Sequence, residues 1–191
     1  MSQIPPPPET HYEQFDTEAA FQAALDRLLE QPGRELRAFD PDLAALRLNA
    51  PERIARLERF LQESRTRRLY LAAHDIGHVT RYCPRMMGLL ARYSHAIQIN
   101  QTHQEIREIQ DSFLVLDSLH YLRRPVARFF RGALGLNDEN EAQAMRGRFG
   151  EIWTASSPAV APTTGSAMKA MTFSGPRRWI SSSSALAARS P

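Results

Sequence analysis

Apolar residues along this chain follow two periods, and the first half of the chain switches repeatedly between them. Helical spacing of apolar side chains recurs in three stretches, at residues 21–29, 54–61 and 86–93. Short alternating or continuous apolar runs lie beside them, at residues 35–39, 68–73 and 95–99. Strands that alternate with helices favour parallel pairing through right-handed crossovers. The first half therefore predicts parallel strands connected by helices.

The second half of the chain has a different pattern. Three short apolar runs follow one another with charged residues between them, at residues 113–116, 120–122 and 133–136. Such a succession is typical of antiparallel strands joined by turns. An amphipathic stretch over residues 138–153 predicts a last helix. We therefore expect an α/β domain of three layers, a mixed sheet with helices on both faces, in the order α-β-α-β-α-β-β-β-β-α.

Residues that cap or break helices support these boundaries. An Asp-Thr pair at residues 16–17 precedes the first helical stretch, and a Pro-Gly pair at residues 32–33 ends it. Residues 49–52 and 138–141 both have the spacing of a capping box, in which side chains at the two ends satisfy free backbone donors. These two segments predict the starts of the second and the last helix.

Both ends of the chain differ in composition from its body. Residues 1–14 include four consecutive prolines and predict a flexible extended arm. Residues 158–191 are rich in Pro, Ala, Ser, Thr and Gly, contain a run of four serines and lack acidic residues. A segment with so little apolar surface is expected to be a disordered, low-complexity tail. A single domain over residues 15–157 remains.

The net charge of +3 suggests at first a nucleic acid or a membrane surface as partner. The excess lies in the tail, however, which holds Lys169, Arg177, Arg178 and Arg189. Residues 1–157 then hold 20 basic and 21 acidic side chains, so the body is close to neutral. The overall charge therefore predicts no basic binding face on the domain.

Cys83 is the single cysteine and cannot form a disulfide within the chain, which is compatible with a reducing compartment. The first residues resemble no secretory signal, and no apolar stretch approaches the length that a membrane span requires. We therefore expect a cytoplasmic protein without a membrane span.

The string HDIGH at residues 74–78 is the sharpest local motif. Imidazole and carboxylate groups bind divalent metals, and a metal-bound water can attack a phosphoester. The string resembles the central motif of the HD-domain metal-dependent phosphohydrolases, which implies a metal site at His74, Asp75 and His78 with catalytic roles for the first two. No histidine lies between His11 and His74, where that family has its first ligand. A metal-dependent phosphohydrolase is therefore an alternative function.

A second motif covers Gln110, Ser112 and Asp117. Members of the phospholipase D superfamily carry His-x-Lys-x4-Asp on a strand, with the histidine as nucleophile and the lysine stabilising the phosphoryl transition state. With Asp117 aligned on the aspartate of that motif, Ser112 stands at the lysine and Gln110 at the histidine. The order of elements over residues 35–153 is also similar to one half of that fold. The resemblance implies the scaffold without its nucleophile and cation, and leaves Asp117 as a candidate catalytic residue.

The body also resembles a bacterial domain of unknown function that we associate with this degenerate scaffold. The similar segments are FDPDLAALRLNAPERI, CPRMMGLLARYSHAI and FGEIWTASSPAV. This resemblance implies no catalytic residue and no cofactor. The leading hypothesis is a non-catalytic accessory or interaction module, with another protein or a fused or partner enzyme domain as its partner. A homodimer is a further alternative, because active members of the superfamily unite two halves.

Four arginines surround the Phe129-Phe130 pair and form a candidate anion site: Arg123, Arg124, Arg128 and Arg131. A guanidinium group pairs bidentately with phosphate or carboxylate. An anion- or nucleic-acid-binding module is the third hypothesis. Nucleic acid is disfavoured, because stacking aromatics and a broad basic face would be expected.

Three further residues are potential metal ligands together with His74 and His78, namely Cys83, His95 and His103. Imidazole and thiolate are both good zinc ligands. No pair among these residues has the tight spacing of a zinc knuckle, so ordinary hydrogen bonding is the favoured interpretation.

Overall fold

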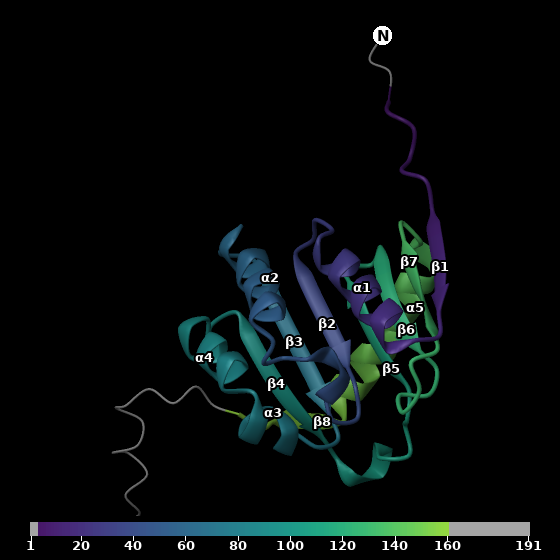
Figure 1. The fold of residues 1–191 in the computed structure, drawn as a ribbon. Coiled ribbons are helices and arrows are strands. Elements are labelled where there is room, and N and C mark those ends of the chain that lie inside the picture. The colour runs from purple at the N-terminus through teal and green to yellow at the C-terminus, as the bar shows by residue number, and fades with distance from the viewer. Residues whose placement is uncertain (1–3, 161–191) are drawn as a thin grey trace, which may run out of the picture.

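An eight-stranded mixed sheet lies between two helical layers in the computed structural model, which describes residues 4–160 (Figure 1). The strands are β1 (His11–Phe15), β2 (Glu35–Phe39), β3 (Arg68–Ala73), β4 (Ile97–Thr102), β5 (Ser112–Leu116), β6 (His120–Arg124), β7 (Gly132–Leu136) and β8 (Ser156–Pro158). The helices are α1 (Glu18–Leu29), α2 (Pro51–Gln62), α3 (Gly77–Tyr82), α4 (Pro84–Arg92) and α5 (Glu139–Thr154), with short 3-10 turns at Ala44–Leu46 and Gln104–Ile106.

The strand order is β1-β7-β6-β5-β2-β3-β4-β8. Only β2, β3 and β4 run parallel to one another, and α2 and the α3–α4 pair connect them. All other neighbouring strands are antiparallel. The predicted three-layer α/β fold with a mixed sheet is therefore confirmed, including the change from parallel to antiparallel pairing in the second half.

β1 is missing from the sequence prediction, which placed residues 1–14 in an extended arm. Phe15 is the only buried residue of the strand, so no apolar period marks it. Backbone pairing with β7 and an ion pair between Glu13 and Arg27 hold it at the sheet edge. The arm prediction is corrected for residues 11–14, because a ladder of backbone hydrogen bonds requires no apolar side chains.

The hydrophobic pattern also predicts neither α3 nor β8. Val79 is the only buried residue of α3. β8 pairs with the end of β4, where Ser156 Oγ accepts a hydrogen bond of 2.9 Å from the Asn100 side chain. The predicted tail, residues 158–191, starts at the last residue of β8 and lies outside the described residues from residue 161 onward.

Two of the predicted helix caps are present and one is not. Thr17 caps α1 by accepting the Ala20 N–H, and Asp138 caps α5 by accepting the Glu141 N–H. The prediction of a capping box at residues 49–52 is wrong, because the N-cap residue of α2 is Ala50, which has no side chain that could accept a hydrogen bond. The Asn49 side chain instead accepts the N–H of residue 85 and ties the start of α2 to α4.

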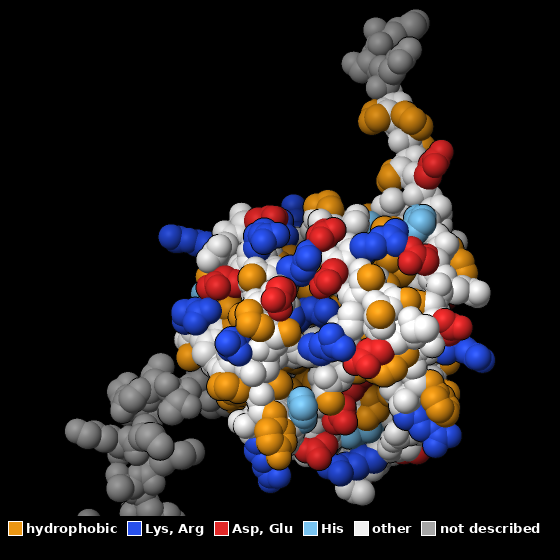
Figure 2. Space-filling view, in the orientation of Figure 1, with side chains coloured by type: hydrophobic (Ala, Val, Ile, Leu, Met, Phe, Trp, Pro, Cys, Tyr) orange, Lys and Arg blue, Asp and Glu red, His pale blue; other side chains and the backbone are white. Residues whose placement is uncertain are grey.

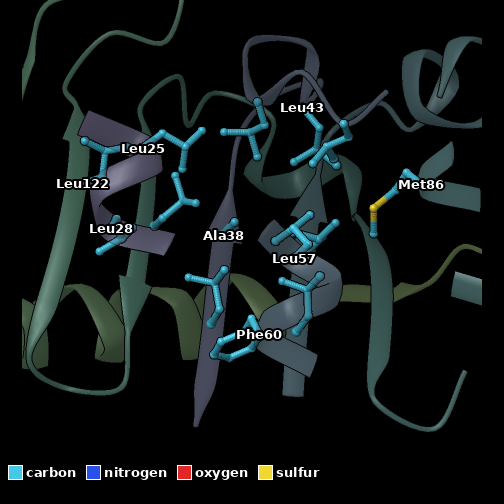
Figure 3. Packing of buried hydrophobic residues seen from close by; sticks show 14 of the residues in the cluster. Leu25, Leu28, Ala38, Leu43, Leu57, Phe60, Met86 and Leu122 are labelled. Carbon is cyan, nitrogen blue, oxygen red and sulfur yellow. The ribbon is translucent and has the colours of Figure 1, made fainter. Parts of the chain in front are cut away.

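The larger core lies between the sheet and the layer of α1, α2 and α4. Figure 3 shows Leu25 and Leu28 of α1 facing Leu122 of β6, and Leu57 of α2 near Ala38 of β2. All five are essentially inaccessible to solvent. Full burial of one leucine side chain contributes about 1.5–3 kcal/mol, so this layer supplies most of the apolar stabilisation.

On the opposite face of the sheet, α5 is the only helix among residues 4–160, and it runs behind the strands in Figure 1. Met145, Phe149 and Ile152 of this helix pack on Phe39 and Phe113. One helix cannot cover eight strands, and within the described residues a hollow remains on this face beside β1 and β7. Figure 2 shows the other side of the molecule, where basic and acidic side chains are interspersed. No helix among residues 4–160 is long and apolar enough to cross a membrane.

Candidate functional site

Three polar side chains meet where β2 ends, β5 begins and β6 ends. The register pairs Phe39 with Phe113 and Ser112 with Arg124, which places Asp40, Ser112 and Arg124 next to one another across three strands. Arg124 Nη2 lies 2.6 Å from Asp40 Oδ2 and donates a 3.2 Å hydrogen bond to Ser112 Oγ. Because β5 is antiparallel to both of its neighbours, the end of β2, the start of β5 and the end of β6 lie at the same end of the sheet.

The Asp40–Arg124 pair is enclosed by protein. The exposed fractions of the two side chains are 3% and 1%. The guanidinium lies over the rings of Phe21 and Phe130, at 4.5 and 5.4 Å from their centroids. The second carboxylate oxygen of Asp40 accepts two backbone N–H groups, including that of Leu43 at 2.8 Å. These contacts satisfy the carboxylate and fix the chain that follows β2.

Burial acts on both charges of this pair. It raises the pKa of the Asp40 carboxyl, although Ser112 and Arg124 act in the opposite direction. It also lowers the pKa of the Arg124 guanidinium, which the nearby carboxylate opposes. The pair is thus a desolvated structural ion pair, with both side chains almost inaccessible to solvent.

The residues aligned with the phospholipase D motif all have structural partners. Gln110 lies in the loop before β5 and donates to the Arg107 carbonyl at 2.9 Å. Ser112 accepts from Arg124. Asp117 follows β5 in a left-handed conformation with φ of 55°, and its Oδ1 accepts the N–H groups of residues 34 and 35, both at 2.9 Å. The Asp117 side chain therefore fixes the start of β2.

His74, Asp75 and His78 do not converge. His74 is buried directly after β3, with Nδ1 2.5 Å from Thr102 Oγ1 and Nε2 2.6 Å from the Ile109 carbonyl. A carbonyl oxygen only accepts hydrogen bonds, so Nε2 carries a hydrogen and donates it to the Ile109 carbonyl. Nδ1 is the ring nitrogen that forms the hydrogen bond with the Thr102 hydroxyl. Asp75 is exposed and accepts the N–H of residue 77 at 2.7 Å. The HDIGH string therefore covers the connection from β3 to α3 and the first two residues of α3.

The other potential metal ligands are also dispersed. His103 Nε2 lies 2.8 Å from Ser157 Oγ, and His95 is exposed after α4. Cys83 is buried between α3 and α4, and burial raises the pKa of its thiol. Within residues 4–160, no group of three or more His, Cys, Asp or Glu residues is placed to hold a metal ion.

The four arginines of the candidate anion site divide into three environments. Arg124 is inaccessible and paired with Asp40, so it is not available to an external anion. The Arg128 guanidinium lies over the exposed Phe129 ring, 4.7 Å from its centroid. Arg123 and Arg131 are exposed and line one hollow of about 880 Å³. The sequence pattern could not distinguish the buried arginine from the exposed ones, because the strand that it predicted ended at residue 122, before Arg123.

This hollow lies between β1, β7 and β6 and the start of α5. Tyr12 and Gln14 of β1 form part of its lining. Sequence reasoning missed both, because it assigned them to the N-terminal arm. In a strand, Tyr12 and Gln14 lie on one face and Glu13, which pairs with Arg27, lies on the other. This alternation was the signal in the sequence that could have predicted the strand.

Comparisons with known proteins agree with this architecture. The family model described as "Domain of unknown function (DUF7931)" matches residues 17–161. No curated protein matches the sequence. Nuc from Salmonella typhimurium, a phospholipase D family member, is similar in structure with a TM-score of 0.57 and 11% identity, over 80% of this chain and 100% of its own.

Two further solved structures are similar. NucT from Helicobacter pylori has a TM-score of 0.56 and 11% identity, over 79% of this chain and 100% of its own. TrmBL2, an archaeal chromatin protein described with a novel mode of DNA binding, has a TM-score of 0.57 and 11% identity. That match covers 83% of this chain and 56% of TrmBL2. At such low identity the likeness concerns the fold, which is phospholipase D-like.

Proposed function

The chain belongs to the DUF7931 family of domains of unknown function, and from that premise we propose that it is a non-catalytic interaction module on a phospholipase D-like fold. Its partner is another protein, or an enzyme domain with which it is associated.

The strongest support comes from Ser112, at the lysine position of the motif. Its hydroxyl accepts a hydrogen bond from Arg124, and Asp40 neutralises that cation at 2.6 Å. A neutralised, desolvated guanidinium has little capacity to stabilise additional charge on a phosphoryl group. Gln110 lacks a nucleophilic atom at the histidine position, since an amide side chain does not form a phosphoenzyme.

Hydrolysis of bis-p-nitrophenyl phosphate, plasmid DNA and phospholipid emulsions by the purified full chain tests the proposal. We expect no rate above that of buffer. Asp117→Asn is the matched control, because the amide oxygen can still accept the two N–H groups at the start of β2. Turnover by the wild type that disappears in the folded Asp117→Asn variant would overturn the proposal and restore a catalytic role for Asp117.

A further inference from the structure

The hollow of about 880 Å³ between β1, β7, β6 and α5 is large enough to hold a small molecule. Sites for small molecules in proteins have volumes of about 300–1,000 Å³. The strand register places Gly135 of β7 between Tyr12 of β1 and Tyr121 of β6. The Tyr121 ring lies against Gly135, because a Cβ atom added there would collide with the ring. The small residues of β7 thus leave space that the longer side chains of its neighbours enclose.

Tyr121 brings a polar atom without a protein partner to the wall of this hollow. Its side chain lines the hollow, although the residue is only 4% exposed. Within residues 4–160, its hydroxyl forms no hydrogen bond with the protein, whereas the Tyr12 hydroxyl accepts a bond of 3.2 Å from Gln14 Nε2. A largely buried polar atom is normally hydrogen-bonded, because its desolvation otherwise costs free energy. The Tyr121 hydroxyl therefore marks a position for a polar group of a ligand.

The hollow holds charges of both signs that do not neutralise one another. Five charged side chains line it, namely the cations Arg123 and Arg131 and the carboxylates Asp16, Asp138 and Glu141. Within the described part of the chain, none of the five belongs to an ion pair. A lining of one sign would select an anion or a cation. This lining leaves both kinds of group unpaired and therefore favours a ligand that carries both charges.

An ammonium group fits the end of the hollow beside Tyr121. Asp138 and Glu141 follow β7 at this end. Burial and the charges of these two carboxylates raise the pKa of Tyr121, so both carboxylates are close enough to act on its hydroxyl. A protonated amine can donate to the phenol oxygen and to a carboxylate, and the exposed Tyr12 ring offers an aromatic face to the cation.

A carboxylate fits the opposite end of the hollow. Arg123 lies two residues from Tyr121 on the same face of β6, and Arg131 precedes β7. Asp16 follows β1 at this end, because β1 and β7 are antiparallel. The two arginines and Asp16 leave one net positive charge here, against two negative charges at the other end.

The spacing along the strands sets the distance between the two charges of the ligand. Successive residues of a strand are about 3.4 Å apart, which places the Arg123 backbone about 7 Å from that of Tyr121 and the Arg131 backbone about 14 Å from that of Gly135. An extended tripeptide is about 10 Å long, so its two charged ends reach both sets of side chains. The charges of a single amino acid are too close together to do so.

We propose that this hollow binds a short zwitterionic peptide of about three residues. Its ammonium group pairs with Glu141 and donates a hydrogen bond to the Tyr121 hydroxyl. Its carboxylate pairs with Arg123 and Arg131. The small residues of β7 leave room for the peptide between these two ends. The site goes beyond the proposed function and is independent of it, because none of its residues is aligned with the phospholipase D motif.

Isothermal titration calorimetry of the full chain with trialanine tests the proposal, and we expect saturable binding. N-acetyl-trialanine lacks the ammonium group, and trialanine amide lacks the carboxylate. Each should bind at least about tenfold more weakly than trialanine, because charge-assisted hydrogen bonds are lost. Alanine should also bind at least about tenfold more weakly, since it reaches only one end of the hollow.

Variants of the protein should cancel the effect of one end of the peptide at a time. In Glu141→Gln, trialanine and its acetylated form should bind alike, because the partner of the ammonium group is lost. In the double variant Arg123→Gln and Arg131→Gln, trialanine and its amide should bind alike. Tyr121→Phe should weaken binding about two- to tenfold, as expected for one neutral hydrogen bond. Its thermal unfolding should be unchanged, because the hydroxyl has no protein partner among the described residues.

Glu151→Gln and Arg128→Gln are the matched controls, because both residues are exposed and neither lines the hollow. Both variants should bind trialanine as the wild type does. The absence of saturable trialanine binding, equal binding of the blocked peptides by the wild type, or equal weakening by the control variants would overturn the proposal.

Discussion

Asp40 and Arg124, 84 residues apart in the sequence, form an ion pair of 2.6 Å in the interior of the domain. The pair joins the end of β2 to the end of β6 across β5. It also supports the loop that carries Val126 and Phe129, because the same guanidinium donates to the Ala127 carbonyl. One buried cation thus links the core of the sheet to the exposed loop after β6.

Replacing Asp40 should destabilise the protein strongly. Asp40→Asn leaves Arg124 buried without a counter-charge, and we expect the free energy of unfolding to fall by about 3–5 kcal/mol. Urea denaturation measures this loss. Glu58→Gln is the control, because it removes the exposed Arg92–Glu58 pair at 3.2 Å and should cost at most about 1 kcal/mol.

A double variant separates the ion pair from its packing. Asp40→Asn combined with Arg124→Met removes both buried charges and keeps a side-chain oxygen for the two backbone N–H groups, so its loss of stability should be smaller than that of Asp40→Asn alone. A loss for Asp40→Asn no larger than that of Glu58→Gln would show that the pair is hydrated and weak.

The Asp117 side chain should act through its two hydrogen bonds and its left-handed backbone. Asp117→Asn keeps an acceptor oxygen and a residue type that tolerates positive φ, so stability should change little. Asp117→Ala loses both bonds and should cost about 1–3 kcal/mol. Urea denaturation distinguishes the two variants, and equal losses would contradict the role of the acceptor oxygen.

The alignment of Asp117 could be made from the sequence, whereas the Asp40–Arg124 pair could not. The apolar run at residues 113–116 fixes the spacing before Asp117, and a strand of this kind is visible in the hydrophobic pattern. Adjacent residues of a strand point to opposite faces, so the fates of Arg123 and Arg124 depend on where β6 ends. A predicted end at residue 122 left both arginines in a basic turn.

The hollow between β1, β7, β6 and α5 depends even more on information beyond the local sequence. β1 forms one wall, and its pairing with β7 joins residues more than 110 positions apart. Backbone hydrogen bonds provide that pairing, with little contribution from apolar side chains. Alternating polarity and helix caps therefore predict most elements of this chain but give no information on which strands lie together at the edge.

His74 should contribute to stability and not to metal binding. Both ring nitrogens are engaged, by Thr102 and by the Ile109 carbonyl, so His74→Ala leaves two buried polar groups unpaired and should cost about 1–3 kcal/mol. Thermal unfolding with added Mn²⁺ or Zn²⁺, and again with EDTA, should be unchanged in the wild type. His95→Ala is the control, because His95 is exposed. Stoichiometric metal that is lost in His74→Ala but kept in His95→Ala would restore the phosphohydrolase hypothesis.

His120 should make the stability of the domain depend on pH. Its side chain is buried at the start of β6, and its Nδ1 accepts the N–H of Asn137 at 3.1 Å. Burial lowers the pKa of His120 in the folded protein, against the opposing charge of Asp117. The ring therefore stays neutral in the folded protein at a pH where an unfolded chain, with a pKa of about 6.5, already binds a proton.

The sign of the pH effect follows from this difference in proton binding. Below about pH 6.5 the unfolded chain binds more protons than the folded one, so the free energy of unfolding decreases as the pH falls and levels off below the folded pKa. His120→Asn removes the titrating group and can still accept the Asn137 N–H, so its stability should vary less with pH. Urea denaturation between about pH 7.5 and pH 5 compares the two proteins across the titration of free histidine. Parallel pH profiles would show that another group causes any loss of stability in acid.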